Sequence, residues 1–183
     1  MVSEETTQEK IMQATYRALC SHGYADLSMQ KIAEEFDKGK SLLYHHFDDK
    51  EDLMISFLDH LVERLEEDMR CLSRDSEDML DCFLDKGLCI DDSEKWEFRK
   101  ALFEMRSQAP FNEKFASRFK KIDNSLLEVL EEILEDREVS EPERSAEIVL
   151  SIIEGMTSRR IAMQDESDLT GFKNDLKSLI SDL

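Results

Sequence analysis

The ten residues from Lys38 to Phe47, KGKSLLYHHF, combine two lysines and two adjacent histidines with no carboxylate. The chain as a whole carries 43 Asp and Glu against 24 Lys and Arg, for a formal net charge of −19. Binding to a phosphate backbone depends on cationic and hydroxyl side chains, and carboxylates on the approaching face would repel it. The composition of this segment therefore indicates a surface that lies against phosphates in an otherwise anionic protein.

The segment belongs to a series of short helices. Helical periodicity predicts a first helix over residues 7–22 that ends at Gly23, then a short helix capped by Ser28. After a break of about three residues, a third helix is expected over residues 40–47, and Asp49 and Asp52 are expected to cap a fourth. Two short helices joined by a tight turn and braced by a preceding helix form a helix-turn-helix unit. The second short helix of such a unit enters the major groove of DNA.

The faces of the third helix follow from a rotation of about 100° per residue. Leu43 and Phe47 lie one turn apart and define the buried side. His45 then points away from the core beside Ser41, with Leu42 and Tyr44 on the two shoulders. We predict that Tyr44 and His45 are exposed, and that His46 flanks the core, where it packs or caps.

Residues 11–53 resemble the TetR-type transcriptional regulators. The resemblance rests on a first helix ending in His-Gly-Tyr at 22–24, Leu-Ser at 27–28, Ile-Ala-Glu at 32–34, Leu-Tyr-His-His-Phe at 43–47 and Lys-Glu-Asp-Leu at 50–53. It implies that phosphates are contacted by Ser28, Tyr44, His45 and Lys50, and that base edges are faced by Gln30, Lys40, Ser41 and Leu42. Lys38, in the cationic segment, completes the DNA-binding candidates.

Two of these positions also have a physical interpretation of their own. Lys50 stands at the amino end of the fourth helix, where backbone N–H groups and a cation can hold one phosphate together. Leu42 replaces the Ser or Thr that is usual in the family. An exposed leucine there can meet a thymine methyl group, or it can be packed.

The remainder of the chain predicts a second helical domain, so that the whole is all-α with about nine helices. Residues 1–49 would form the helix-turn-helix DNA-binding domain and residues 50–183 an effector-binding and dimerisation domain. Further helices are expected near residues 50–70, 77–89, 94–108, 110–136, 141–164 and 168–182. Ser140 and Glu143 are expected to form a capping box, with Pro142 inside the first turn.

The last two expected helices predict a dimer interface. Apolar residues in the final helix recur at spacings of three and four, as in a coiled-coil seam, and the helix before it has an apolar face too broad for one neighbour. A homodimer built as a four-helix bundle is also what the family resemblance implies. The alternative is that both helices only close their own subunit. The interface candidates are Ile148, Ile152, Met156, Leu169, Phe172, Leu176, Leu179 and Leu183.

The middle helices are rich in aromatic and methionine residues at helical spacing, which serve either as core or as pocket lining. In similar proteins this region encloses a small-molecule pocket, and ligand binding shifts the fourth helix. The composition suits an apolar or aromatic effector better than a sugar. The pocket candidates are Leu61, Phe83, Phe98, Leu102, Met105, Phe119 and Ile122.

Other sites and locations are disfavoured by the sequence. It holds no nucleophile elbow, Gly-rich phosphate loop or H-E-x-x-H motif, and adjacent histidines diverge by about 100° and do not chelate one metal. We therefore expect neither an enzyme nor a cofactor or metal. No segment is long and apolar enough to span a bilayer, and the first ten residues lack signal-peptide features, which favours the cytoplasm. The four cysteines indicate reduced thiols, with a redox-sensing pair at Cys82 and Cys89 as the alternative.

The negative charge is unevenly distributed. Residues 1–50 hold six Lys and Arg against nine Asp and Glu, a net charge of −3, whereas the other 133 residues hold 18 against 34, a net charge of −16. Such a surface suits a protein that works in high salt, and an acidic protein from an ordinary environment is the alternative. Together with the helix-turn-helix pattern, the resemblance to TetR-type regulators implies a dimeric, ligand-responsive repressor that binds a palindromic double-stranded DNA operator and is released by a small-molecule effector. The competing hypothesis is an acidic helical module that binds another protein and has lost DNA binding.

Overall fold

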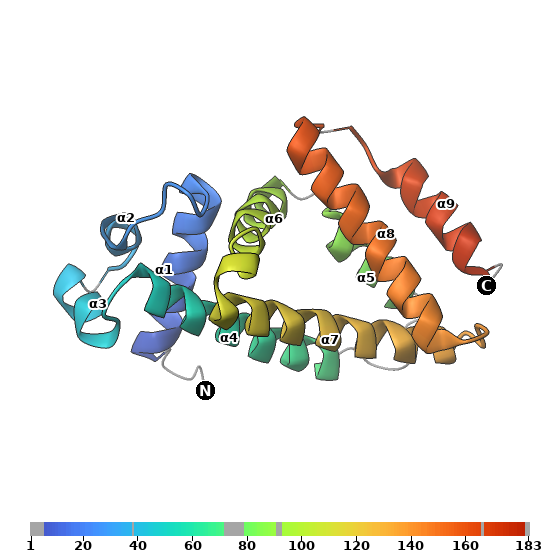
Figure 1. Ribbon diagram of the computed structural model, residues 1–183, viewed down its shortest axis with the longest axis horizontal. Helices are drawn as coiled ribbons and strands as arrows, with labels where there is room; N and C mark the ends of the chain where they lie inside the picture. The colour runs from blue at the N-terminus through green and yellow to red at the C-terminus, as the bar shows by residue number, and fades with distance from the viewer. Residues whose placement is uncertain (1–5, 38, 72–78, 91–92, 166, 182–183) are drawn as a thin grey trace. The chain divides into compact units, whose positions relative to one another are not determined.

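The computed structural model describes residues 6–37, 39–71, 79–90, 93–165 and 167–181, with backbone only at 65–71, 93 and 94. The described residues form nine α-helices and one 3₁₀ helix, and none of them lies in a strand (Figure 1). The all-α fold expected from helical periodicity is therefore confirmed. The helices are α1 (Thr7–His22), α2 (Met29–Glu34), α3 (Lys40–His46), α4 (Lys50–Cys71), α5 (Met79–Leu88), α6 (Ser93–Arg106), η1 (Ala109–Phe111), α7 (Glu113–Glu135), α8 (Pro142–Met163) and α9 (Thr170–Ser181).

None of the helices in the described ranges combines the length and the apolar character needed to cross a lipid bilayer.

Local signals at both ends define α1. Thr6 and Glu9 form a reciprocal capping box, in which the Glu9 amide donates to Thr6 Oγ1 at 3.2 Å and the Thr6 amide to Glu9 Oε2 at 2.6 Å. Gly23 ends the helix at φ +68°, a conformation that glycine adopts without steric cost, and its amide donates to the Leu19 carbonyl. The boundaries agree with those predicted from the sequence.

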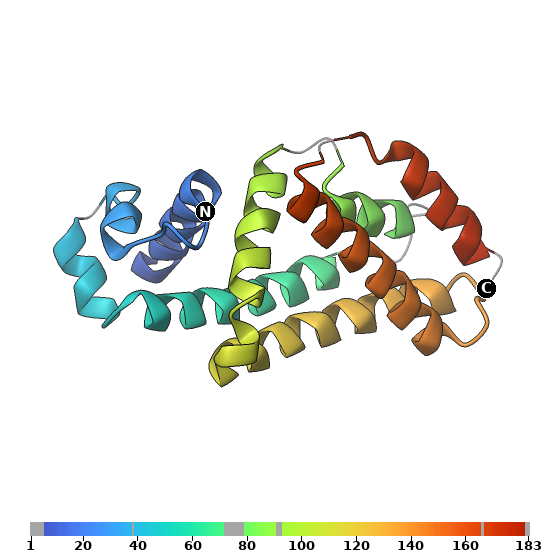
Figure 2. The same cartoon turned by 45° about the horizontal axis from the view of Figure 1, so that its top comes forward.

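The packing divides the chain into two compact units, and the first comprises residues 1–63 and 93–120. Its core is made by buried residues of α1, α2, α3, the start of α4, α6 and the start of α7. Figure 2 shows α2 and α3 following α1 and leading into α4. Within this unit α1 packs against α6. Helix α6 thus packs with the N-terminal helices although it lies beyond residue 49 in the sequence. The division of functions between residues 1–49 and 50–183 stays a prediction.

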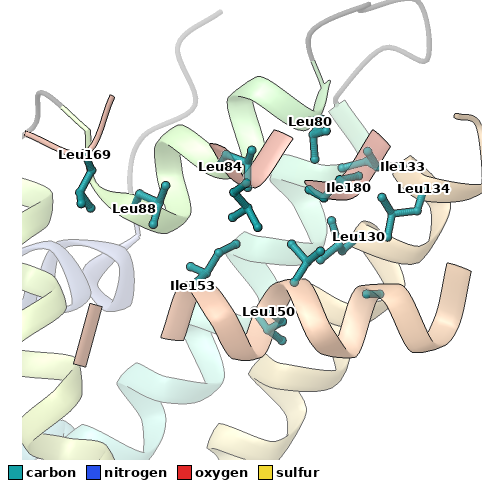
Figure 3. Close-up of a cluster of buried hydrophobic side chains, with 13 residues drawn as sticks. Leu80, Leu84, Leu88, Leu130, Ile133, Leu134, Leu150, Ile153, Leu169 and Ile180 are labelled. Carbon is teal, nitrogen blue, oxygen red and sulfur yellow. The ribbon is translucent and has the colours of Figure 1, made fainter. Parts of the chain in front are cut away.

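The second unit comprises residues 64–92 and 121–183. Its core joins buried aliphatic side chains from α5, α7, α8 and α9, which point toward one another in Figure 3. Helix α5 packs on α8, where a Cβ added at Gly87 would lie 3.2 Å from Ile153 Cγ2. The small residue therefore permits a close approach of the two helices. Helix α9 runs back in the opposite direction to α8 (Figure 1) and packs on both α5 and α8.

Polar contacts add to this packing around α9. Lys173 pairs with both Asp81 and Asp85 of α5, and Lys177 Nζ lies 2.6 Å from Asp81 Oδ2. The buried guanidinium of Arg160, on α8, donates to the carbonyl of Ser167 in the connection that precedes α9.

The start of α8 corrects one sequence prediction. The N-cap is Glu141, in the left-handed conformation at φ +48° and without a side-chain cap, rather than Ser140 paired with Glu143. Proline disfavours the α conformation at the residue before it, so Glu141 cannot serve as the first helical residue that a cap at Ser140 would require. The helix begins at Pro142 itself, where the missing amide hydrogen costs nothing.

Candidate DNA-binding site

Helix α2 begins and ends at well-defined contacts. Ser28 caps it by accepting the Lys31 amide at 3.3 Å, and Met29 and Ile32 are buried on its inner face. At its carboxyl end, Arg17 of α1 donates from Nη2 to the Glu35 carbonyl at 2.7 Å, and its Nε lies 3.3 Å from Glu35 Oε2. The Arg17 contact was not foreseen from the sequence, since no spacing rule links residues 17 and 35.

The turn into α3 contains Gly39 at φ +90°, which serves as the N-cap residue without a side-chain hydrogen bond. A side chain at this position would be strained, so the positive φ of the turn favours glycine. Lys38, a predicted DNA contact, lies outside the described residues.

Helix α3 presents the face that its sequence predicts. Leu43 and Phe47 are buried, whereas Tyr44 is 46% exposed and His45 is exposed, as expected from the helical rotation. His46 corrects the prediction, because it is exposed instead of packed, although its ring centroid lies 6.3 Å from that of Phe47. A short helix of seven residues has little core of its own to cover, so a flanking position remains open to solvent.

The other recognition candidates occupy the same short helices. Lys40 and Ser41 are exposed, and Lys40 Nζ lies 5.6 Å from the centroid of the Tyr44 ring. Gln30, on α2, is exposed and donates from Nε2 to Glu34 Oε1 at 3.3 Å. Leu42 is half-buried, which lies between the two interpretations of that position.

The carboxylates beside α3 are engaged in capping α4. Asp49 Oδ1 accepts the Asp52 amide at 2.9 Å, as predicted. Asp52 Oδ2 in turn accepts the Asp48 amide at 3.3 Å, one residue earlier than in a standard capping box. Hydrogen bonding orients these carboxylates toward backbone N–H groups at the start of α4.

Lys50 makes contacts that the sequence did not predict. Its ammonium donates to the carbonyls of Tyr24 at 3.0 Å and Leu27 at 3.1 Å, and lies 4.2 Å from the centroid of the Tyr24 ring. Burial lowers the pKa of Lys50 below its usual value, and the negative charge of Glu104 opposes that shift. An ammonium has three donors, so two carbonyls leave one for a phosphate.

The pocket candidates fall in both units. Leu61, Phe98 and Leu102 are partly buried in the first unit, where Met105 and Phe119 are buried. Phe98 contacts the rings of Tyr16 at 4.6 Å and Phe57 at 6.1 Å, which places it in an aromatic cluster of the first unit. Phe83 and Ile122 belong to the second unit and are partly buried. Membership of a ligand pocket stays a prediction for all seven.

The interface candidates all lie in the second unit and have different surroundings. Leu169 and Leu176 are buried in the core of the second unit itself. Ile148, on α8, is 39% exposed and Leu179, on α9, is 45% exposed. Partial burial is found at Ile152, Met156 and Phe172, and Leu183 lies outside the described residues.

No disulfide joins Cys20, Cys82 and Cys89, the cysteines whose side chains the structure describes.

Comparison with known proteins places these features in a family. Residues 11–57 match the family model described as bacterial regulatory proteins, tetR family. The chain resembles the crystal structure of a TetR transcription regulator from Haloarcula marismortui, with 34% sequence identity, a TM-score of 0.82 and coverage of 97% of both chains. A comparison with curated protein sequences gave no match.

Two further solved structures share the fold at lower identity. A transcriptional regulator from Rhodococcus sp. Rha1 is 16% identical with a TM-score of 0.76, covering 96% of this chain and 94% of that one. The transcriptional regulator FadR from Bacillus subtilis, solved in complex with stearoyl-CoA, is 22% identical with a TM-score of 0.64, covering 95% and 98%.

The resemblance to the Haloarcula marismortui protein extends over nearly the whole of both chains, and the family model covers the helices whose exposed and buried faces are described above. The members of this family are DNA-binding regulators and not enzymes. The chain belongs to the TetR family of transcriptional regulators.

Proposed function

We propose that this protein is a ligand-responsive repressor that binds a palindromic operator as a homodimer and is released by a small-molecule effector. The observation that carries the proposal is the outer face of α3, where Lys40, Ser41, Tyr44 and His45 are all exposed and no carboxylate occurs in the helix. Such a face can approach a phosphate backbone although the protein as a whole is strongly anionic.

The side chains divide by role. Ser28, Tyr44, His45 and Lys50 would contact phosphates; the Ser28 oxygen already accepts a hydrogen bond as N-cap, which leaves its O–H free to donate. Base edges would be faced by Gln30, Lys40, Ser41 and Leu42, with Lys38 beside them. Phosphate contacts fix the orientation on the duplex, and contacts to base edges supply the discrimination among sequences.

The dimer would use the apolar side chains that the second unit leaves exposed. Ile148 lies near the start of α8 and Leu179 near the end of α9, so the antiparallel course of these helices brings both to one end of the pair. Ile152, Met156 and Phe172, which are partly buried against the core of the same unit, would extend this surface. Two such pairs can associate as a four-helix bundle. Two recognition helices about 34 Å apart would then meet successive major-groove turns.

The effector would be apolar or aromatic, in keeping with the aromatic and methionine side chains of α6 and α7. The fold neighbour FadR from Bacillus subtilis was solved with stearoyl-CoA, whose long acyl chain belongs to the same chemical class. Binding would release the operator by changing the spacing of the two recognition helices.

An electrophoretic shift assay tests the proposal. The protein is titrated, at several KCl concentrations, against a duplex from the region upstream of its own coding sequence and against a shuffled duplex of the same composition. We expect tighter binding to the upstream duplex, with affinity that falls as salt rises.

The net charge of −19 favours one alternative function, an acidic helical module that binds another protein and no longer binds DNA. Failure to shift either duplex, even at the lowest salt concentration, would support that alternative. Equal binding to both duplexes would show a DNA-binding protein without sequence preference.

A further inference from the structure

The turn between α1 and α2, residues 23–27, is held by α6. The Ala25 amide donates to Glu104 Oε2, on α6, at 2.8 Å. The same carboxylate lies directly beside Gly23, where an added Cβ would be 3.1 Å from Glu104 Oε1 and 3.2 Å from Oε2. Glycine at position 23 therefore serves two purposes, since it ends α1 at a positive φ and leaves room for this carboxylate.

A second side chain holds the same turn through its carbonyls. Lys50, at the start of α4, donates to Tyr24 and Leu27, the residues on either side of the amide that Glu104 accepts. The Tyr24 ring lies under the ammonium and makes an edge contact with Phe115 of α7 at 6.0 Å. The turn thus has a donor bound by an anion from α6 and two acceptors bound by a cation from α4.

The turn leads directly into the DNA-binding helices. Leu27 is buried, and Ser28, the next residue, is the N-cap of α2. Only a few residues separate Gly23, which ends α1, from Ser28, which caps α2, so few backbone dihedrals are available to absorb a displacement of residue 25 before it reaches α2.

We propose that Glu104 is a positioning residue that ties α6 to the α1–α2 turn, and that Glu104 and Lys50 together set the position of α2 for DNA binding. This inference rests on the proposed function. It adds a direct route by which a shift of α6 reaches the helix-turn-helix unit, separate from any movement along α4. Because Glu104 itself is an anion, it acts through the turn and not by touching DNA.

Amide hydrogen exchange of the free protein tests the contact. In the wild type we expect the Ala25 amide to be protected. In Glu104→Ala its protection should fall by about tenfold, the effect of losing a hydrogen bond to a charged group. Glu104→Gln keeps an acceptor oxygen and should restore most of it. The matched control is Glu97→Ala, which removes a carboxylate that pairs with Lys100 at 2.7 Å on the same helix.

DNA binding by the same variants tests the positioning role. Glu104→Ala should bind the preferred duplex about five- to tenfold more weakly than the wild type. The dependence of log affinity on log salt concentration should stay unchanged, because no phosphate contact is lost. Glu104→Gln should recover affinity in step with its Ala25 protection, and Glu97→Ala should match the wild type in both measurements.

The outcomes separate this inference from the proposed function. An unprotected Ala25 amide in the wild type, or equal protection in Glu104→Ala, would overturn the inference even if the alanine variant proved unstable. Lost protection with undiminished affinity for the preferred duplex would overturn the positioning role. If the wild type binds no duplex at all, the proposed function fails, and with it the role in DNA binding, whatever the exchange data show.

Discussion

At the residue scale, the proposed DNA binding by the outer face of α3 depends on the absence of carboxylates as much as on the side chains that are present. Lys40 lies over the ring of Tyr44, and the α3 sequence contains no carboxylate that could neutralise its charge. The acidic residues that flank α3 along the chain, Asp37 before it and Asp48 and Asp49 after it, all lie outside the helix. A lysine held in this way can donate to the O6 and N7 atoms of a guanine.

Lys40→Ala should therefore relax discrimination among operator variants by about 1–3 kcal/mol at one base pair, with a smaller loss on random duplexes. Competition binding with single-base operator variants measures the effect. Lys120→Ala, which removes an exposed cation from α7, is the control. Equal losses on all sequences would identify Lys40 as a phosphate contact only.

At the element scale, α9 is fastened to α5 by a small ionic cluster. Lys173, whose side chain is only 13% exposed, lies between Asp81 and Asp85, and Asp81 also binds Lys177. Hydrogen bonds from Lys177 and Lys173 lower the pKa of Asp81 below its usual value. Burial alone would lower the pKa of Lys173, but hydrogen bonds to Asp85 and Asp81 raise it. Both shifts mean that the charged forms stabilise the folded state.

The sign of each shift gives a pH dependence. Ionised Asp81 stabilises the folded protein above the pKa of about 4 that it has in the unfolded chain. This stabilisation is lost as pH falls through the lower pKa of the folded protein. Protonated Lys173 stabilises the folded protein below the pKa of about 10.4 that it has in the unfolded chain. This stabilisation is lost as pH rises through the higher pKa of the folded protein.

Asp81→Asn should consequently lower the free energy of unfolding by about 1–2 kcal/mol at pH 7. The difference from the wild type should shrink as pH falls from about 4, where Asp81 of the unfolded chain takes up a proton, through the lower pKa of Asp81 in the folded protein. Chemical denaturation between pH 3 and 9 measures both. Glu132→Gln, which removes an exposed carboxylate from α7, controls for the general change in charge. A difference that persists unchanged to pH 3 would contradict the assigned role of Asp81.

At the scale of the whole molecule, the net charge and the exposed apolar residues have opposite effects on self-association. Most of the net charge of −19 lies beyond residue 50, where repulsion opposes self-association unless an apolar surface outweighs it or salt screens it. Ile148 and Leu179 are the large exposed aliphatic residues near one end of the α8–α9 pair. The expectation that this surface functions in concentrated salt would reconcile the two, because salt screens the repulsion.

Ile148→Glu combined with Leu179→Glu should convert the proposed dimer into monomers, because association would bury unpaired charge. Light scattering in molar salt measures the mass, and operator affinity should fall because each monomer holds one half-site. Leu176 is left unchanged, since it is buried in its own subunit and its replacement would test folding instead. Phe111→Glu, at an exposed phenylalanine in the first unit, is the control. If the wild type is a monomer under these conditions, the proposed dimer is wrong.

The sequence alone was sufficient to predict the approximate α-helices, the caps at Gly23, Ser28 and Asp49, and which face of α3 is buried. These features depend on residues within one or two turns of each other. Gly23 ends α1, Ser28 caps α2, and the spacing of Leu43 and Phe47 defines which side of α3 is buried. The capping pattern at Ser140 gave a wrong prediction, because the conformational effect of Pro142 on Glu141 outweighed it.

Only the tertiary structure decided which side chains meet across the chain. Lys50 reaches the carbonyls of residues 24 and 27, and Glu104 reaches the amide of Ala25 across 79 positions of sequence. Leu176 and Leu179 both fit the apolar pattern of α9, yet the first is buried in the core and the second is exposed. Periodicity identifies an apolar face, but the partners of that face depend on how distant helices pack, and no local spacing encodes that arrangement.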